Sequence, residues 1–122
     1  MARGTTVEFD FVLMGEVLAP MPGVVAVDVG SRCEAGVIDH HFASQEVGEE
    51  CAASLLVAHP EFVLEHAREL GGTVTIRMHR EPDFDCVASA FLVKSLLETG
   101  RLPPVAPTLA AYAREVDRKS VV

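Results

Sequence analysis

The order of apolar and polar positions along the chain predicts four strands. Residues 7–14 alternate at first and then become continuously apolar, which favours a strand, with a short helix as the alternative. Residues 24–27 are an unbroken apolar run, typical of a strand covered on both faces. Val37 and Ile38 form a shorter run after a glycine-containing turn, and residues 73–78 alternate like a half-buried strand.

Helical spacing of apolar residues occurs between and after these strands. The expected helices cover residues 46–59, 60–70, 86–97 and 108–116. The acids Glu49 and Glu50 would lie near the positive end of the first helix. Alternating strands and helices predict an α/β fold, with a parallel, Rossmann-like sheet flanked by helices, in a single domain over residues 1–122.

Polar residues follow three of the predicted strands. Asp28 comes directly after residues 24–27, and Asp39-His40-His41 comes directly after Ile38. The segment from His79 to Asp85 follows the last strand. Ligands of parallel sheets gather at the carboxyl ends of the strands. We therefore expect these three segments to meet at one edge of the sheet.

Composition narrows the class of protein. The chain has 122 residues, of which 49% are hydrophobic, so it is large enough for a real core. No apolar run approaches the ~20 residues that cross a bilayer, and the first residues lack the apolar core of a signal peptide. The three cysteines, Cys33, Cys51 and Cys86, show no Cys-x-x-Cys spacing, which is typical of reduced thiols. We expect a soluble, cytoplasmic protein with no membrane partner.

The net charge of −8 disfavours binding to long nucleic acids, which requires a basic surface. Part of that charge lies in the three polar segments. Two bound divalent cations would bring four positive charges and leave a formal charge of −4, so that a phosphate group could approach.

The side chains of these segments suit divalent cations. An isolated Asp-His-His sequence is also typical of a solvated turn, but a second acidic and histidine-containing segment favours a binding site. Carboxylates and imidazoles with no thiolate among them, unless Cys86 contributes one, favour Mn²⁺, Mg²⁺ or Co²⁺ over a structural zinc ion. Two such ions about 3.5–4 Å apart generate a hydroxide at neutral pH and hold both oxygens of a phosphoryl displacement.

These motifs together resemble the DHH phosphoesterase superfamily. The resemblance rests on Asp39-His40-His41, on Asp28 upstream, and on the spacing His79-x-x-Pro-Asp83-x-Asp85. The superfamily includes manganese-dependent (family II) pyrophosphatases, RecJ-type exonucleases, exopolyphosphatases and small-oligonucleotide phosphodiesterases. The resemblance covers residues 24–117 and implies a single DHH-type domain.

The resemblance also implies a ligand set for two metal ions, Mn²⁺ or alternatively Mg²⁺ or Co²⁺. His79 and Asp83 would hold one ion. His40 and Asp85 would hold the other, and Asp28 would bridge the two.

Further roles follow from the same resemblance. Asp39 would orient His40 through its ring N–H. His41 would face the scissile phosphate as a hydrogen-bond donor or general acid. Asp117 would match a later metal-binding aspartate of the family.

The chain departs from the family in two ways. The His79 segment follows the Asp39 segment, whereas family members have the reverse order. Members also carry a C-terminal substrate-binding domain, which we expect to be missing here. If the two motifs were far apart within one chain, a homodimer would have to complete the site.

The function expected from this resemblance is hydrolysis of a phosphate ester or anhydride by a hydroxide that two metals activate. The substrate would be small: pyrophosphate, a short oligonucleotide or a nucleotide. The alternative is a non-catalytic metal- or nucleotide-binding regulatory domain with the same fold.

Overall fold

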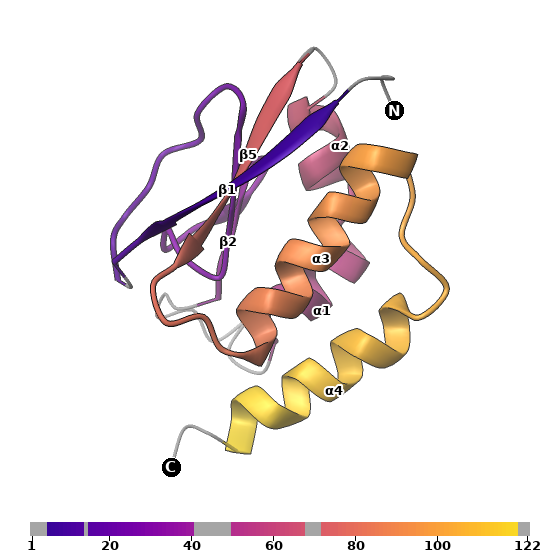
Figure 1. The fold of residues 1–122 in the computed structure, drawn as a ribbon. Coiled ribbons are helices and arrows are strands. Elements are labelled where there is room, and N and C mark those ends of the chain that lie inside the picture. Colours follow the sequence, from indigo (N-terminus) through magenta and orange to yellow (C-terminus); the bar gives the residue numbers. More distant parts are fainter. Residues whose placement is uncertain (1–4, 14, 41–49, 68–71, 120–122) are drawn as a thin grey trace.

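A five-stranded, mostly parallel sheet forms one layer of the molecule (Figure 1). The computed structural model describes residues 5–13, 15–40, 50–67 and 72–119. In chain order the strands are β1 (Thr6–Val12), β2 (Val24–Val27), β3 (Cys33–Glu34), β4 (Val37–Ile38) and β5 (Thr73–His79). Their spatial order is β1-β5-β2-β4-β3, and only β3 runs antiparallel to its neighbour.

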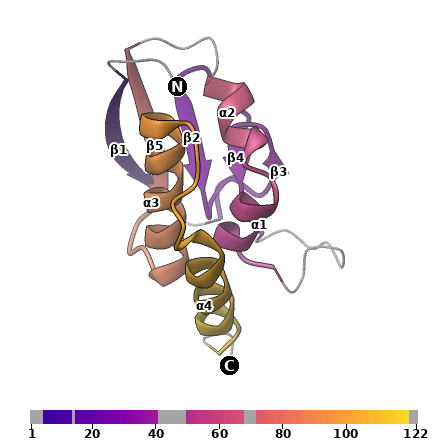
Figure 2. The same ribbon diagram turned by 90° about the vertical axis from the view of Figure 1, so that its right-hand side faces the viewer.

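The described helices all lie on one face of this sheet (Figure 2). They are α1 (Ala52–Ala58), α2 (Glu61–Ala67), α3 (Phe84–Thr99) and α4 (Ala106–Lys119). Helix α3 crosses β5 and β2, α1 contacts β4, and α4 packs on α1 and α3. A left-handed Gly100 at φ 82° ends α3, which is two residues longer at each end than the predicted 86–97.

The main core lies between the sheet and the helices. Val25, Ile38 and Ile76 point from the strands into the same buried cluster as Leu56 and Leu92 of the helices. Such burial contributes roughly 1.5–3 kcal/mol for each large side chain. A smaller cluster of Ala26, Val29 and Val37 lies apart from this core, and Val12 and Leu18 pack against it.

Two expectations about the sheet are corrected by the structure. The sheet is mixed rather than wholly parallel, because Cys33 and Glu34 pair antiparallel with β4. Cys33 and Glu34 do not form an apolar run like that of Val37 and Ile38, so their sequence does not identify them as a strand. The sheet was expected to be flanked by helices, whereas the described helices cover one of its faces only. Leu18 packs against the second cluster, which consists of Ala26, Val29 and Val37.

The helix predicted over residues 46–59 also differs. Helix α1 begins at Ala52, with Cys51 as its N-cap, and residues 41–49 lie outside the described part of the chain. Glu50 precedes the helix and accepts a hydrogen bond from Ser54. The last helix begins at Ala106 and ends at Lys119, and is therefore longer than the predicted 108–116.

Strand order places the three polar segments together. Strand β5 lies directly beside β2, and β2 lies beside β4, so the carboxyl ends of these parallel strands meet at one edge. Asp28, Ser31 and Glu81 have left-handed backbones there, with φ of 60°, 61° and 57°. Non-glycine residues rarely adopt this conformation, and such residues cluster at functional sites.

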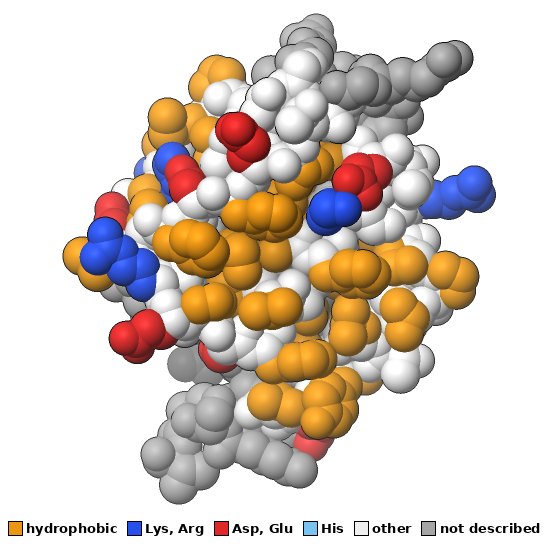
Figure 3. All heavy atoms as spheres, in the orientation of Figure 1, with side chains coloured by type: hydrophobic (Ala, Val, Ile, Leu, Met, Phe, Trp, Pro, Cys, Tyr) orange, Lys and Arg blue, Asp and Glu red, His pale blue; other side chains and the backbone are white. Residues whose placement is uncertain are grey.

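The described part of the chain contains no helix that is both long and apolar enough to cross a bilayer. Apolar side chains are nevertheless visible on the face that carries β1 and α3 (Figure 3). Phe9 and Phe11 of β1 and Val87 and Phe91 of α3 are about half exposed.

Candidate metal centre

Asp28 lies at the centre of the cluster of acidic and imidazole side chains. It directly follows β2 and is fully buried. Its Oδ2 atom lies 2.9 Å from Nε2 of His79, the last residue of β5. Its Oδ1 atom lies 3.1 Å from Nε2 of His40, which follows β4. One carboxylate therefore faces two imidazoles that come from the two neighbouring strands.

Each of these histidines also faces a second carboxylate from the start of α3. Nε2 of His79 lies 3.8 Å from Oδ1 of Asp83, and Nε2 of His40 lies 3.5 Å from Oδ2 of Asp85. The Asp83 side chain is 47% exposed, while the other four residues are at most one-tenth exposed. The cluster is thus two pairs of acid and imidazole that share Asp28 and open to solvent at Asp83.

The first turn of α3 fixes both of its carboxylates. Asp83 is the N-cap of α3, and its Oδ1 atom accepts a hydrogen bond of 3.0 Å from the backbone N–H of Cys86. Asp85 reaches across to the start of α1, where its two oxygens accept hydrogen bonds from the backbone N–H groups of Ala52 and Ala53 at 3.0 and 2.9 Å. This contact between two helix N-termini could not be read from local spacing.

Those contacts keep Asp85 ionised. Burial on its own raises the pKa of this carboxyl group, but His40 and the amides of Ala53 and Ala52 outweigh burial and bring the pKa below its usual value. A charged acceptor is therefore available beside His40.

The hydrogen bonds of His79 fix the roles of its two nitrogens. Nδ1 lies 3.0 Å from the carbonyl oxygen of Arg80, which can only accept, so Nδ1 carries a proton. Burial on its own lowers the pKa of His79. The Arg80 carbonyl and the Asp28 carboxylate raise it by more, so the pKa lies above its usual value. Nε2 faces the Asp28 carboxylate at 2.9 Å, so it is the ring nitrogen that could bind a cation. Histidines that bind metals commonly donate their other ring N–H to a carbonyl or carboxylate in this way.

Asp39 is buried beside this cluster and fixes the backbone that carries His40. Its Oδ1 atom accepts a 2.8 Å hydrogen bond from the backbone N–H of His40, and its Oδ2 atom accepts one of 2.8 Å from Ser31. These two hydrogen bonds are with backbone N–H groups, and the contact of Asp39 with the imidazole ring of His40 that the resemblance implies stays a prediction. A carboxylate oxygen of Asp39 also lies within 4.8 Å of ligand atoms of Asp28 and His40.

Cys86 lies on the buried side of the cluster. It is fully buried, and its Sγ atom lies within 4.8 Å of a carboxylate oxygen of Asp28 and a ring nitrogen of His79. The thiol donates a long hydrogen bond of 3.8 Å to the Val27 carbonyl. Burial and the neighbouring carboxylates raise the pKa of this thiol to about 12.

Two of the residues expected at the site lie beyond what the structure describes. His41 falls outside the described residues, and Asp117 lies on α4 with its side chain outside them. The other expected residues, Asp28, Asp39, His40, His79, Asp83 and Asp85, converge at one edge of the sheet within a single chain. A second chain is therefore not required to bring the two motifs together.

The converged side chains fit divalent cations. Asp28, Asp83 and Asp85 supply carboxylate oxygens, and His40 and His79 direct Nε2 toward them. Anionic oxygens and imidazole nitrogens at these separations form the donor set that Mn²⁺, Mg²⁺ and Co²⁺ accept.

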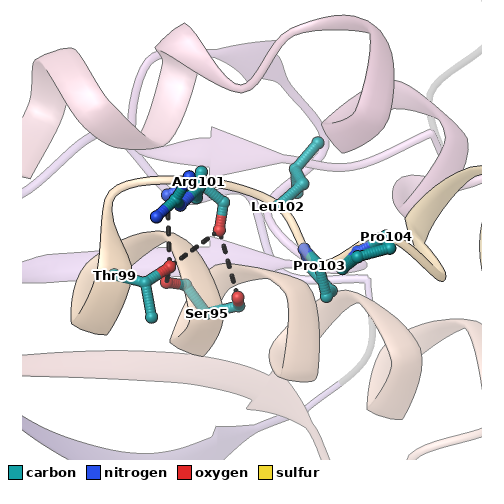
Figure 4. Close-up of a pocket in the computed structure, with 6 residues that line it drawn as sticks. All are labelled: Ser95, Thr99, Arg101, Leu102, Pro103 and Pro104. Carbon is teal, nitrogen blue, oxygen red and sulfur yellow. Dashed lines mark hydrogen bonds between the residues drawn. The ribbon is translucent and has the colours of Figure 1, made fainter.

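A cavity of about 400 Å³ lies elsewhere, where α3 leads into α4 (Figure 4). It is lined by Ser95, Thr99, Arg101, Leu102, Pro103 and Pro104. The hydroxyls of Ser95 and Thr99 both donate to the Arg101 carbonyl, at 3.1 and 3.0 Å. Because a helix rises about 1.5 Å per residue, Ser95 lies about 15 Å along α3 from Asp85. This cavity is separate from the cluster.

No protein-family model, curated protein or solved structure matches this chain significantly. Its function has to be inferred from its own residues.

Proposed function

We propose that this chain is a metal-dependent phosphohydrolase domain of the DHH type, acting on a phosphate ester or anhydride of a small substrate. The observation that supports the proposal most strongly is the position of Asp28. Its two oxygens face histidines from two different strands, and each histidine faces a further carboxylate. Two cations held side by side would use this doubled arrangement, with one carboxylate between two sets of ligands.

The contacts support the ligand sets that the resemblance implies. His79 and Asp83 would hold one divalent cation, and His40 and Asp85 would hold the second. Asp28 would bridge both, and Mn²⁺, Mg²⁺ and Co²⁺ are the candidate ions. Two such ions supply Lewis acidity and a nucleophilic water at neutral pH.

The exposed side of the cluster and the residues next to it would bind and position the substrate. Asp83 is the exposed member of the cluster, so a phosphate would approach from its side. Asp39 fixes the backbone at His40, the residue before His41, through a 2.8 Å hydrogen bond. His41 would then donate a hydrogen bond or a proton to the substrate.

Hydrolysis assays with Mn²⁺ test the proposal. The chain is incubated with pyrophosphate, short oligonucleotides and cyclic dinucleotides, and released phosphate or nucleotide is measured. We expect turnover of at least one substrate, and its loss in Asp28→Asn. Glu98→Gln is the matched control, because Glu98 pairs with Lys94 on the exposed surface of α3.

The outcomes separate the two candidate functions. Binding of Mn²⁺ without turnover of any substrate would favour a metal-binding regulatory domain. Failure to bind Mn²⁺, Mg²⁺ or Co²⁺ would contradict both.

A further inference from the structure

The environment of Cys86 suggests a specific metal preference. Its Sγ atom, a carboxylate oxygen of Asp28 and a ring nitrogen of His79 all lie within 4.8 Å of one another. All three residues are fully buried. Asp83, whose carboxylate lies 3.8 Å from His79, adds a fourth donor at the exposed end.

These separations are close to those of a filled site. Tetrahedral coordination with bonds of about 2.0–2.3 Å places ligand atoms roughly 3.3–3.8 Å apart. Because 4.8 Å is an upper limit, a contraction of at most about 1–1.5 Å within the first turn of α3 would bring Sγ into the coordination sphere.

We propose that Cys86 is a protein ligand of the cation held by His79, together with Asp28 and Asp83. This inference rests on the proposed two-metal function. The ion takes the place of the Sγ proton, which is released to solvent, and Val27 loses only a long hydrogen bond of 3.8 Å. A thiolate favours Zn²⁺ and Co²⁺ over Mg²⁺, because soft ligands prefer the softer ions. The position beside His40 has only oxygen and nitrogen donors in this proposal, so the two positions would differ in selectivity.

A structural role is the competing explanation. Buried cysteines commonly behave as small apolar residues, and Cys86 belongs to the main core. Cys51 provides a matched comparison, because it too is fully buried, lies at a helix N-terminus and has a thiol close to Asp85.

Cobalt spectroscopy distinguishes these explanations without measuring activity. The full chain is titrated with Co²⁺, and its near-ultraviolet and visible absorption is recorded. We expect a thiolate-to-cobalt charge-transfer band that saturates at one equivalent. Cys86→Ser should lose the band while keeping the weaker visible bands of bound Co²⁺, and Cys51→Ser should keep both.

Competition titrations measure how much Cys86 contributes to the affinity for each metal ion. Cys86→Ser should weaken Zn²⁺ binding by at least about tenfold, the lower end of the loss seen even for residues that only support a ligand. Its Mg²⁺ affinity should change little.

The wild-type spectrum keeps the inference falsifiable even if Cys86→Ser does not fold. Visible Co²⁺ bands without a charge-transfer band would overturn the thiolate ligand and leave the proposed function intact. Loss of the band in Cys51→Ser alone would also overturn it. No Co²⁺ binding at all would contradict the proposed function together with this inference.

Discussion

Replacing Asp28 with asparagine is the perturbation with the largest expected effect. Asparagine has nearly the shape of aspartate and tolerates the left-handed backbone at φ 60°, whereas alanine would add backbone strain. The substitution removes the carboxylate that faces both His40 and His79. Both cation positions should therefore weaken together, although only one residue has changed.

The magnitude follows from ligand linkage. At a Mn²⁺ concentration of about 100 times Kd, each occupied position stabilises the folded state by about 2.7 kcal/mol, so two contribute about 5 kcal/mol. For a domain of this size, 1 kcal/mol shifts Tm by about 4 °C, so the wild-type shift is about 20 °C. If the substitution weakens each position about a hundredfold, the shift falls to about 3 °C.

Thermal unfolding with and without Mn²⁺ measures this shift, and titration calorimetry measures the number of ions bound. Each variant is compared with its own metal-free form, because Asp28→Asn also removes buried hydrogen bonds worth about 1.5–3 kcal/mol each. Glu98→Gln should retain the wild-type shift. If Asp28→Asn still bound two Mn²⁺ ions with a shift near the wild-type value, a bridging role for Asp28 would be refuted.

The other predictions concern the surrounding residues. His40→Ala should weaken Mn²⁺ binding, while His41→Ala should keep the metal and reduce turnover about 10²–10⁴-fold; equal metal loss in calorimetry would refute this division. Asp85→Ala should lower the free energy of unfolding of the metal-free protein by about 2–5 kcal/mol in urea, because two buried backbone amides lose their acceptor. Asp83→Ala removes an exposed helix cap and should lower it by only about 1 kcal/mol. The folded-state pKa of His79 is raised above 6.5, so its contribution to metal-free stability should be complete below pH 6.5 and disappear as pH rises through that pKa. Mn²⁺ affinity should increase over the same interval, as the Nε2 proton leaves, and a pH-independent affinity would contradict this role.

Local sequence was sufficient to predict the strands that have a clear hydrophobic pattern. The run at residues 24–27 is β2, and the alternation at residues 73–78 is β5 extended by His79. Because both strands are parallel and adjacent, their ends bring Asp28 and His79 together, as expected from the sequence.

Contacts between distant segments were not predictable in the same way. Asp85 accepts hydrogen bonds from the N-terminus of α1, at Ala52 and Ala53. These residues precede Asp85 by 33 and 32 positions, a separation that no helix or strand periodicity predicts. Strand β3 has only two residues and is defined by its pairing with β4 rather than by its own pattern. Cys86 is next to the acidic motif in sequence, but only the packing of α3 against β2 and β5 places its thiol beside Asp28 and His79.

Electron paramagnetic resonance of the Mn²⁺-loaded chain tests the central claim most directly. That claim is that Asp28 holds two cations side by side, a few ångströms apart. As the second equivalent of Mn²⁺ binds, the hyperfine pattern of isolated Mn²⁺ should give way to the spectrum of an exchange-coupled pair. Asp28→Asn should not show the coupled spectrum. A signal of isolated Mn²⁺ that grows in proportion through the second equivalent, or saturates after the first, would contradict the account.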